Sequence, residues 1–226
     1  MTADRPINRT YNQNANPKEA CEMLTFYYAK NSAAYAPHIL LEDIGADYNA
    51  VRIDFMTGEQ RSPAYLAVNP KGRLPSLVTE KGVLTETPAI LVYLAQRFPE
   101  HDLAPSDPFE FAIAQAFNSY MASTVHVAHA HKHRGARWAD DPAAHNSMRA
   151  KVKENMTECA QMIETHYFKG PYVLGDKFSF CDPYMALVTR WLKDDGVDLD
   201  PFAKIRAHDA LMRERPSMQR VLELHA

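Results

Sequence analysis

Cysteine is scarce in this chain of 226 residues: only Cys21, Cys159 and Cys181 are present. They form no CxxC pair and show no metal-ligand spacing, so the sequence indicates neither a disulfide framework nor a metal site. Such cysteine usage is typical of a reducing compartment, and we expect the protein to be cytoplasmic.

Long apolar runs and an excess of positive charge are also missing. The longest apolar run, Ala89 to Ala95, has seven residues, whereas a membrane-spanning helix needs about 20. The first 22 residues lack the apolar region of a signal peptide, and we expect them to form a flexible N-terminal extension. The net charge of −3 argues against a broad surface for nucleic acid or anionic membranes.

The first half of the remaining chain alternates strand and helix patterns. The elements follow the order β-α-β-α-β-β-α, which is the order of a thioredoxin-like domain, and we assign this domain to residues 23–100. Its first two strands are expected to be parallel because a helix connects them. The expected strands cover residues 23–28, 48–55, 74–78 and 83–85, and the expected helical segments cover residues 37–45, 64–68 and 86–98.

The second half shows helical periodicity without a convincing strand. Residues 99–108 are polar and contain three prolines, which indicates a linker. Residues 109–226 are therefore expected to form an all-helical domain, so the fold class is α/β plus all-α. We expect helices over residues 109–134 and 143–168, a central helix from 182 to about 191, and two shorter helices beginning near residues 201 and 216.

The most informative stretch is residues 66–98. It contains a turn at residues 69–72, a proline at the start of a strand, and a Glu86-Thr87-Pro88 sequence that opens a helix. A turn with free backbone donors, together with a carboxylate and a hydroxyl at a helix start, suits a small zwitterionic ligand that resembles a peptide.

These residues resemble a known family. NPKGRLPSL at residues 69–77, followed by LTETPAI at 84–90, is similar to the glutathione-binding half of the cytosolic glutathione transferases. YVLGDKFSFCD at residues 172–182 resembles the buried capping motif of their helical domain, and the C-terminal helices resemble the bacterial beta-like branch. The resemblance covers residues 23–226. It implies glutathione as co-substrate, a role in detoxification, and a homodimer with no nucleic acid or membrane partner.

The resemblance also implies roles for residues around the turn. The peptide bond before Pro75 is expected to be cis, and the backbone of Leu74 is expected to pair with the cysteinyl part of glutathione. Glu86 and Thr87 would hold the γ-glutamyl end. Lys71 and Arg73 are both candidates for the glycyl carboxylate.

Glutathione chemistry requires a thiolate, and a free thiol has a pKa near ~8.5. The beta-like branch places a cysteine in the turn after the first strand, but this chain has Ala33 at that position. The remaining candidates for activating the thiol are Ser32, Asn31 and Tyr28, in that order of preference. Ser32 is equally suited to a structural role at a helix start, and Tyr28 to a place in the core.

The long helix at 109–134 contains further candidates. His126 lies in a YMASTVH sequence that resembles the beta-like helix whose histidine reaches the active-site cleft. Arg134, Arg137 and Trp138 follow it and are candidates for the electrophile pocket, although Trp138 suits packing between domains equally well. His126, His129 and His133 share a helical face, but no acidic or cysteine ligand joins them, so no metal is expected.

Three functions are consistent with these observations. The first is a glutathione transferase whose bound thiolate attacks a small electrophile, expected to be hydrophobic, or a peroxide. The second is another glutathione-dependent enzyme, such as an isomerase, a dehalogenase or a disulfide reductase. The third is a non-catalytic dimeric protein that binds glutathione, since the expected cysteine is missing. The fold alone does not decide among them.

Overall fold

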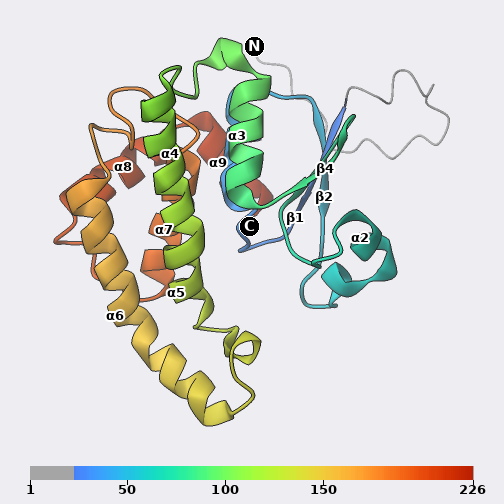
Figure 1. Ribbon diagram of the computed structural model, residues 1–226, viewed down its shortest axis with the longest axis vertical. Helices are drawn as coiled ribbons and strands as arrows, with labels where there is room; N and C mark the ends of the chain where they lie inside the picture. The colour runs from blue at the N-terminus through green and yellow to red at the C-terminus, as the bar shows by residue number, and fades with distance from the viewer. Residues whose placement is uncertain (1–22, 226) are drawn as a thin grey trace.

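The computed structural model describes residues 23–225, so the expected N-terminal extension of residues 1–22 lies outside the described part. The first part of the chain has the predicted order of strands and helices (Figure 1). Its elements are β1 (Leu24–Tyr28), α1 (Tyr35–Ile44), β2 (Tyr48–Arg52), the short helix η1 (Glu59–Arg61), α2 (Pro63–Val68), β3 (Ser76–Thr79), β4 (Gly82–Thr85), α3 (Thr87–Arg97) and the short helix η2 (Pro99–His101).

The strands form one sheet in the order β2-β1-β3-β4. β1 runs parallel to β2, as predicted, and β3 runs antiparallel to both β1 and β4. Side chains alternate between the two faces of β1. Phe26 and Tyr28 enter the main core beside α1, whereas the Tyr27 ring packs 5.6 Å from Tyr65 of α2 on the other face. The predicted thioredoxin-like architecture is confirmed.

The second part is helical from residue 108 onward. It contains α4 (Pro108–Tyr120), η3 (Met121–Val125), α5 (His126–Ala130), η4 (Gly135–Arg137), α6 (Pro142–His166), α7 (Asp182–Asp194), α8 (Ala203–Arg213) and α9 (Pro216–Leu224). Figure 1 shows α4 and α6 side by side, with α7 behind them. The predicted helical domain is therefore present.

One predicted helix is wrong in its extent. The segment expected to run from residue 109 to 134 contains a wide π-helical turn, η3, and its last helical residue is Ala130. Within this region Ser123 donates its hydroxyl to the carbonyl of Ser119, a bond that competes with the regular helical ladder. Beyond the helix, Gly135 packs so closely on the His145 ring of α6 that an added Cβ would lie 2.9 Å from it. The chain must turn there to reach α6.

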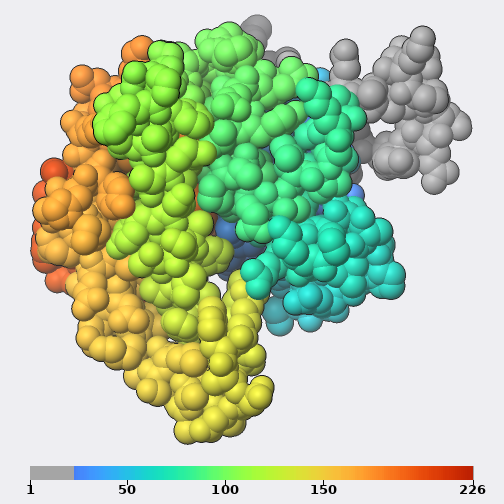
Figure 2. Space-filling view, in the orientation of Figure 1, coloured from blue at the N-terminus to red at the C-terminus, as the bar shows by residue number. Residues whose placement is uncertain are grey.

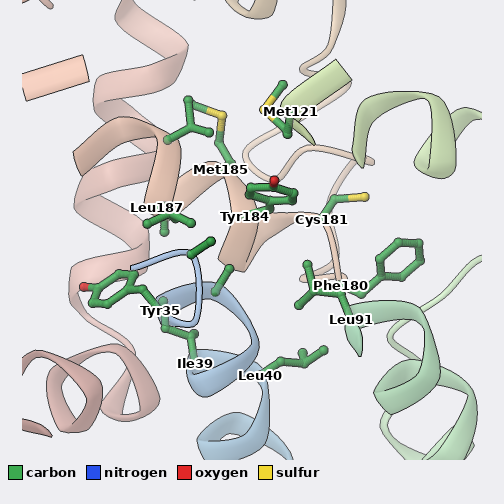
Figure 3. Packing of buried hydrophobic residues seen from close by; sticks show 14 of the residues in the cluster. Tyr35, Ile39, Leu40, Leu91, Met121, Phe180, Cys181, Tyr184, Met185 and Leu187 are labelled. Carbon is green, nitrogen blue, oxygen red and sulfur yellow. The ribbon is translucent and has the colours of Figure 1, made fainter. Parts of the chain in front are cut away.

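Helix α7 is central, as its apolar circumference predicts. Every residue from 182 to 189 is buried, and the side chains of Tyr184, Met185 and Leu187 lie in a core shared with Tyr35 and Ile39 of α1 (Figure 3). The first turn of α7 is tied to the preceding loop by the buried carboxylate of Asp182, which accepts hydrogen bonds from the backbone N–H groups of nearby loop residues at 2.7 and 2.8 Å.

A buried chain of polar groups joins the C-terminus to the first part of the molecule. His38 of α1 lies with Nδ1 2.9 Å from Nε2 of His225 and with Nε2 2.9 Å from the hydroxyl of Tyr48, which donates to the carboxylate of Glu42. Burial, with added repulsion from His225, lowers the pKa of His38 to about 3. Burial, with added repulsion from Arg190, lowers the pKa of His225 to about 4. Both imidazoles are therefore neutral at pH 7.

This network predicts a loss of stability in mild acid. In the unfolded chain each imidazole takes up a proton near pH 6.5, but in the folded protein it does so only near pH 3–4. Protonation therefore favours unfolding: the stability present above pH 6.5 declines as the pH falls, by about 2 kcal/mol per histidine at pH 5. Denaturant unfolding at pH 7 and pH 5 measures this loss.

The variant His225→Leu should show a smaller difference between pH 7 and pH 5 than the parent protein. His101→Leu, which alters an exposed histidine of η2, is the matched control and should leave that difference unchanged. Equal differences in the His225→Leu variant and the parent would show that His225 does not cause the loss.

Candidate functional site

A cavity of about 960 Å³ lies between the sheet part and the helical part. Figure 2 shows the surface hollowed between the cyan region around α2 and the yellow-green region that follows α5, with the blue N-terminal part at its floor. The lining comes from the turn after β1, the turn before β3, the start of α3, the segment from α5 to residue 138, and α7. Residues far apart in sequence therefore meet at one site.

The turn before β3 forms one wall. Asn69 is buried behind it and donates its Nδ2–H to the carbonyl of Arg73 at 2.7 Å, and the Tyr65 hydroxyl donates to the same carbonyl at 2.7 Å. Leu74 and Pro75 line the cavity, and the peptide bond between them is cis, as the resemblance implied. The sheet ladder begins only at Ser76, so the backbone groups of Leu74 precede it and are available to a ligand.

The start of α3 forms the adjacent wall. Glu86 and Thr87 both line the cavity, and Thr87 is buried with its hydroxyl donating to the carbonyl of Ala33 at 3.3 Å. Glu86 is exposed, and its carboxylate lies 2.5 Å from Nζ of Lys71. Lys71 also contacts the Thr85 hydroxyl and does not line the cavity. Lys71 thus forms an ion pair with Glu86 and does not lie where it could bind the glycyl carboxylate of a ligand in the cavity.

Of the three candidates for thiol activation, Tyr28 lies away from the cavity. Its ring packs 4.8 Å from His38 and 5.0 Å from His225, on the core face of β1. Burial raises the pKa of its hydroxyl, although Arg52 opposes the shift. This geometry favours a core role for Tyr28, which the sequence left open. Side chains alternate along a strand, and that of Tyr28 lies on the core face.

Ser32 and Asn31 both line the cavity, but their hydrogen bonds differ. Ser32 is buried; its hydroxyl donates to the carbonyl of Ala29 at 2.8 Å and accepts from the N–H of Ala34 at 3.3 Å. The one hydroxyl proton of Ser32 is therefore already used in a hydrogen bond within the turn. Asn31 is exposed and has a left-handed φ of 55°. Its amide oxygen accepts a hydrogen bond from Arg190, so the two N–H donors of the amide are not used in that bond.

The helical part supplies aromatic and basic groups. His126 and His129 both pack on the Trp191 ring, at centroid distances of 4.7 and 4.6 Å. Burial lowers the pKa of His126 to about 4, with Arg134 adding the largest charge effect, so this imidazole is neutral at pH 7. Nδ1 of His129 lies 2.7 Å from the buried carboxylate of Asp195.

The remaining candidates also reach the cavity. Arg73 and Arg134 line it, and so does Trp138, whose half-exposed ring packs 4.4 Å from that of His131. His133 lines the cavity as well, but among residues 23–225 no group of three or more histidine, cysteine or acidic side chains is suited to hold a metal ion.

Arg61, His129 and Arg190 also line the cavity but were not proposed as site residues from the sequence. Arg190 could have been found as a charged residue that directly follows the buried residues 183–189 of α7, which made it a candidate for a site. His129 is positioned by a hydrogen bond to Asp195, which is 66 positions away in the sequence. Arg61 lies on a short helix without a recognisable motif, so neither residue had a local signal.

The helices of residues 23–225 also bear on a membrane location. None of the helices in this part of the chain combines the length and the apolar character that a span requires.

Comparison with known proteins gives a consistent result. The family model for the glutathione S-transferase N-terminal domain matches residues 22–96. A solved glutathione transferase homologue from Sulfitobacter, with bound glutathione, is 44% identical, with a TM-score of 0.87, over 89% of this chain and 98% of that one. A bacterial beta-class glutathione S-transferase from Sphingomonas chungbukensis is 26% identical, with a TM-score of 0.77, over 89% and 98% of the two chains.

A curated relative, maleylacetoacetate isomerase from Pseudomonas aeruginosa, is 27% identical over 209 residues, which cover 87% of this chain and 97% of the relative. The matches thus extend over both the sheet part and the helical part. These matches show that the chain belongs to the glutathione transferase family.

Proposed function

We propose that the protein binds glutathione in the cavity and activates its thiol for attack on an electrophilic second substrate. The observation that carries the proposal is the convergence of three groups on one cavity: the Leu74 backbone ahead of the sheet ladder, the Glu86–Thr87 start of α3, and the polar turn at Asn31. The cysteinyl part of glutathione would pair with Leu74, and its γ-glutamyl ammonium would meet Glu86.

The glycyl carboxylate is assigned to the other end of the site. Arg73 and Arg61 line the cavity, whereas Lys71 does not and is engaged by Glu86. Arginine suits a carboxylate because its planar guanidinium presents two parallel N–H donors. We therefore favour Arg73, with Arg61 beside it, over Lys71.

For the thiolate we place Asn31 ahead of Ser32. A hydrogen bond donated to a thiolate favours the charged form and so lowers the thiol pKa. The Ser32 proton is used within its own turn, whereas the Asn31 amide has N–H groups to offer, and Arg190 brings a positive charge close to them. Ser32 is retained as the second candidate.

An isomerase is the alternative that a specific observation favours, because the Pseudomonas relative bears that name and is similar over nearly its whole length. A thiolate that adds to an activated double bond and is then expelled would need the same glutathione site. A disulfide reductase that relies on a protein thiol is disfavoured, since Ala33 occupies the expected cysteine position and Cys159 and Cys181 are buried.

We also propose that the protein is a cytoplasmic homodimer. The support is its family membership together with the cysteine usage of the sequence. Sedimentation of the full chain tests the dimer.

The test of the main proposal has two stages. Calorimetric titration with glutathione should show binding at micromolar to millimolar concentrations, and S-methylglutathione serves as a ligand without an ionisable thiol. A panel of aryl halides, activated alkenes, a cis-trans isomerisable diene and peroxides then follows. Binding without turnover of any member would favour the non-catalytic hypothesis.

A further inference from the structure

Four arginines line the cavity without a carboxylate partner in residues 23–225. They are Arg61 in η1, Arg73 in the turn before β3, Arg134 directly before η4 and Arg137 at its end. Within the described range, the ion pairs formed by arginine involve only Arg213, Arg215 and Arg220, which lie elsewhere. Unneutralised guanidinium groups gathered at one cavity generate a strong positive potential.

The other cations near the cavity are engaged by neighbours. Lys132 lies 3.0 Å from the carboxylate of Asp195, and Arg190 donates to Asn31 and lies over the Tyr35 ring at 5.2 Å. The unpaired charge is therefore concentrated in one region, where the arginines come from both parts of the molecule.

Arg61 lies against the turn that carries Arg73, and the charges of the four arginines act on one another. A Cβ on Gly72 would lie 2.8 Å from Nη1 of Arg61, so the absence of a side chain at residue 72 allows Arg61 to lie against the turn. Burial, and then the charge of Arg73, lower the pKa of Arg134. Burial, and then the charges of the other three arginines, lower the pKa of Arg137 to about 10. A bound anion would relieve this mutual repulsion.

Glutathione alone does not account for all four. Its γ-glutamyl end is assigned to the start of α3, and its single glycyl carboxylate to Arg73 and Arg61. Arg134 and Arg137 remain, on the helical side, where Trp138 and His126 also line the cavity. His126 adds no charge because it is neutral at pH 7.

We infer that Arg134 and Arg137 form an anion subsite, and that the second substrate is an electrophile carrying a carboxylate. The inference rests on the proposed function and specifies its substrate class, replacing the sequence expectation of a merely hydrophobic electrophile. Trp138 would contact the apolar body of such a substrate, and the two guanidinium groups would bind its carboxylate.

Two glutathione conjugates test the subsite by binding alone. S-(4-carboxy-2-nitrophenyl)glutathione carries the extra carboxylate, and its aryl methyl ester has the same shape without the charge. In calorimetry at fixed ionic strength, the carboxylate conjugate should bind about 10-fold to 100-fold more tightly than the ester, the usual advantage of hydrogen bonds to a charged group. Equal binding, or tighter binding of the ester, would overturn the inference.

The variant Arg134→Gln/Arg137→Gln should reduce this advantage to less than about 3-fold. The remaining preference would come from the general positive potential of the cavity. Arg206→Gln removes the same charge from an exposed position on α8, outside the cavity, and should retain the full advantage. If the double variant does not fold, Arg137→Gln alone carries the test, because Arg137 is exposed on a short helix. An unchanged advantage in the arginine variants would also overturn the inference.

Turnover separates this inference from the proposed function. Glutathione and 4-chloro-3-nitrobenzoate form the carboxylate conjugate when the C–S bond forms, chloride leaves and the thiol proton passes to solvent. Relative to the uncatalysed rates, the benzoate should be accelerated more than its methyl ester. Turnover of both substrates without a preference for the benzoate would leave the proposed function intact and contradict the subsite. Failure of glutathione and both conjugates to bind would contradict both.

Discussion

Asn31→Gly is expected to lower the turnover of bound glutathione by about 10²-fold and to change its affinity little. Loss of one donor to a developing or resident anion typically costs ~10²–10³ in rate. The affinity should persist because Leu74, Glu86 and Thr87, which are proposed to hold the rest of the molecule, are unaffected. The thiol of bound glutathione should titrate at higher pH in the variant, since the thiolate has lost a hydrogen bond.

Glycine is the informative replacement at this position. Asn31 has a φ of 55°, in the left-handed region, where an alanine would add strain of about 1–2 kcal/mol. Glycine adopts that conformation freely, so Asn31→Gly removes the amide and preserves the turn. The thiolate absorbance of bound glutathione, measured against pH, then reports on the sulfur alone.

Two further variants complete the comparison. Ser32→Ala should destabilise the protein by about 1–2 kcal/mol, because it removes bonds to Ala29 and Ala34, but it should shift the thiol titration little. Tyr28→Phe should leave the titration unmoved, since this ring lies in the core. If Ser32→Ala raises the titration midpoint and Asn31→Gly does not, the activating role passes to Ser32.

The limits of the sequence interpretation are clearest at this turn. The strand that leads into it was predictable from its aromatic and β-branched residues, and so was the turn itself. The choice between Asn31 and Ser32 was not, because it depends on which hydrogen bonds are already used. The bond from Arg190 to Asn31 joins residues 159 positions apart, and no local pattern records such a contact.

The same distinction explains the error in the helical part. Helical periodicity continues through η3, since a π-helical turn inserts one residue and leaves both flanks helical. The helix ends at Ala130, and beyond it Gly135 packs on His145 of α6, which is a tertiary contact. By contrast, the cis bond at Pro75 and the start of α3 were predictable because each lies in a motif of adjacent residues, NPKGRLPSL and LTETPAI.

Glu86→Gln is expected to weaken glutathione binding by about 30-fold to 150-fold, which corresponds to ~2–3 kcal/mol. The variant keeps the length of the side chain but loses the charge that would face the γ-glutamyl ammonium. This loss lies near the lower end of the range for truncated charge pairs because the Glu86 side chain is exposed in the free protein.

Lys71→Met should have the opposite or no effect. Its Nζ lies 2.5 Å from the Glu86 carboxylate, so the lysine competes with the ligand ammonium for that group. Removing the lysine should leave glutathione affinity unchanged or raise it a few-fold, in keeping with the small free energy of an exposed ion pair. A larger loss in Lys71→Met than in Glu86→Gln would show that the γ-glutamyl end lies elsewhere.

The backbone of Glu86 offers a separate test of its role. Its φ of 73° and ψ of 123° are unfavourable for a residue with a side chain, and such a conformation costs of order 1–3 kcal/mol. Glu86→Gly should therefore raise the free energy of unfolding by about 1 kcal/mol and still lose at least as much glutathione affinity as Glu86→Gln. A more stable protein that binds its ligand less tightly would mean that the strain at Glu86 is tolerated because it holds the carboxylate at the cavity. If Glu86→Gly instead kept full affinity, the carboxylate would have no part in binding.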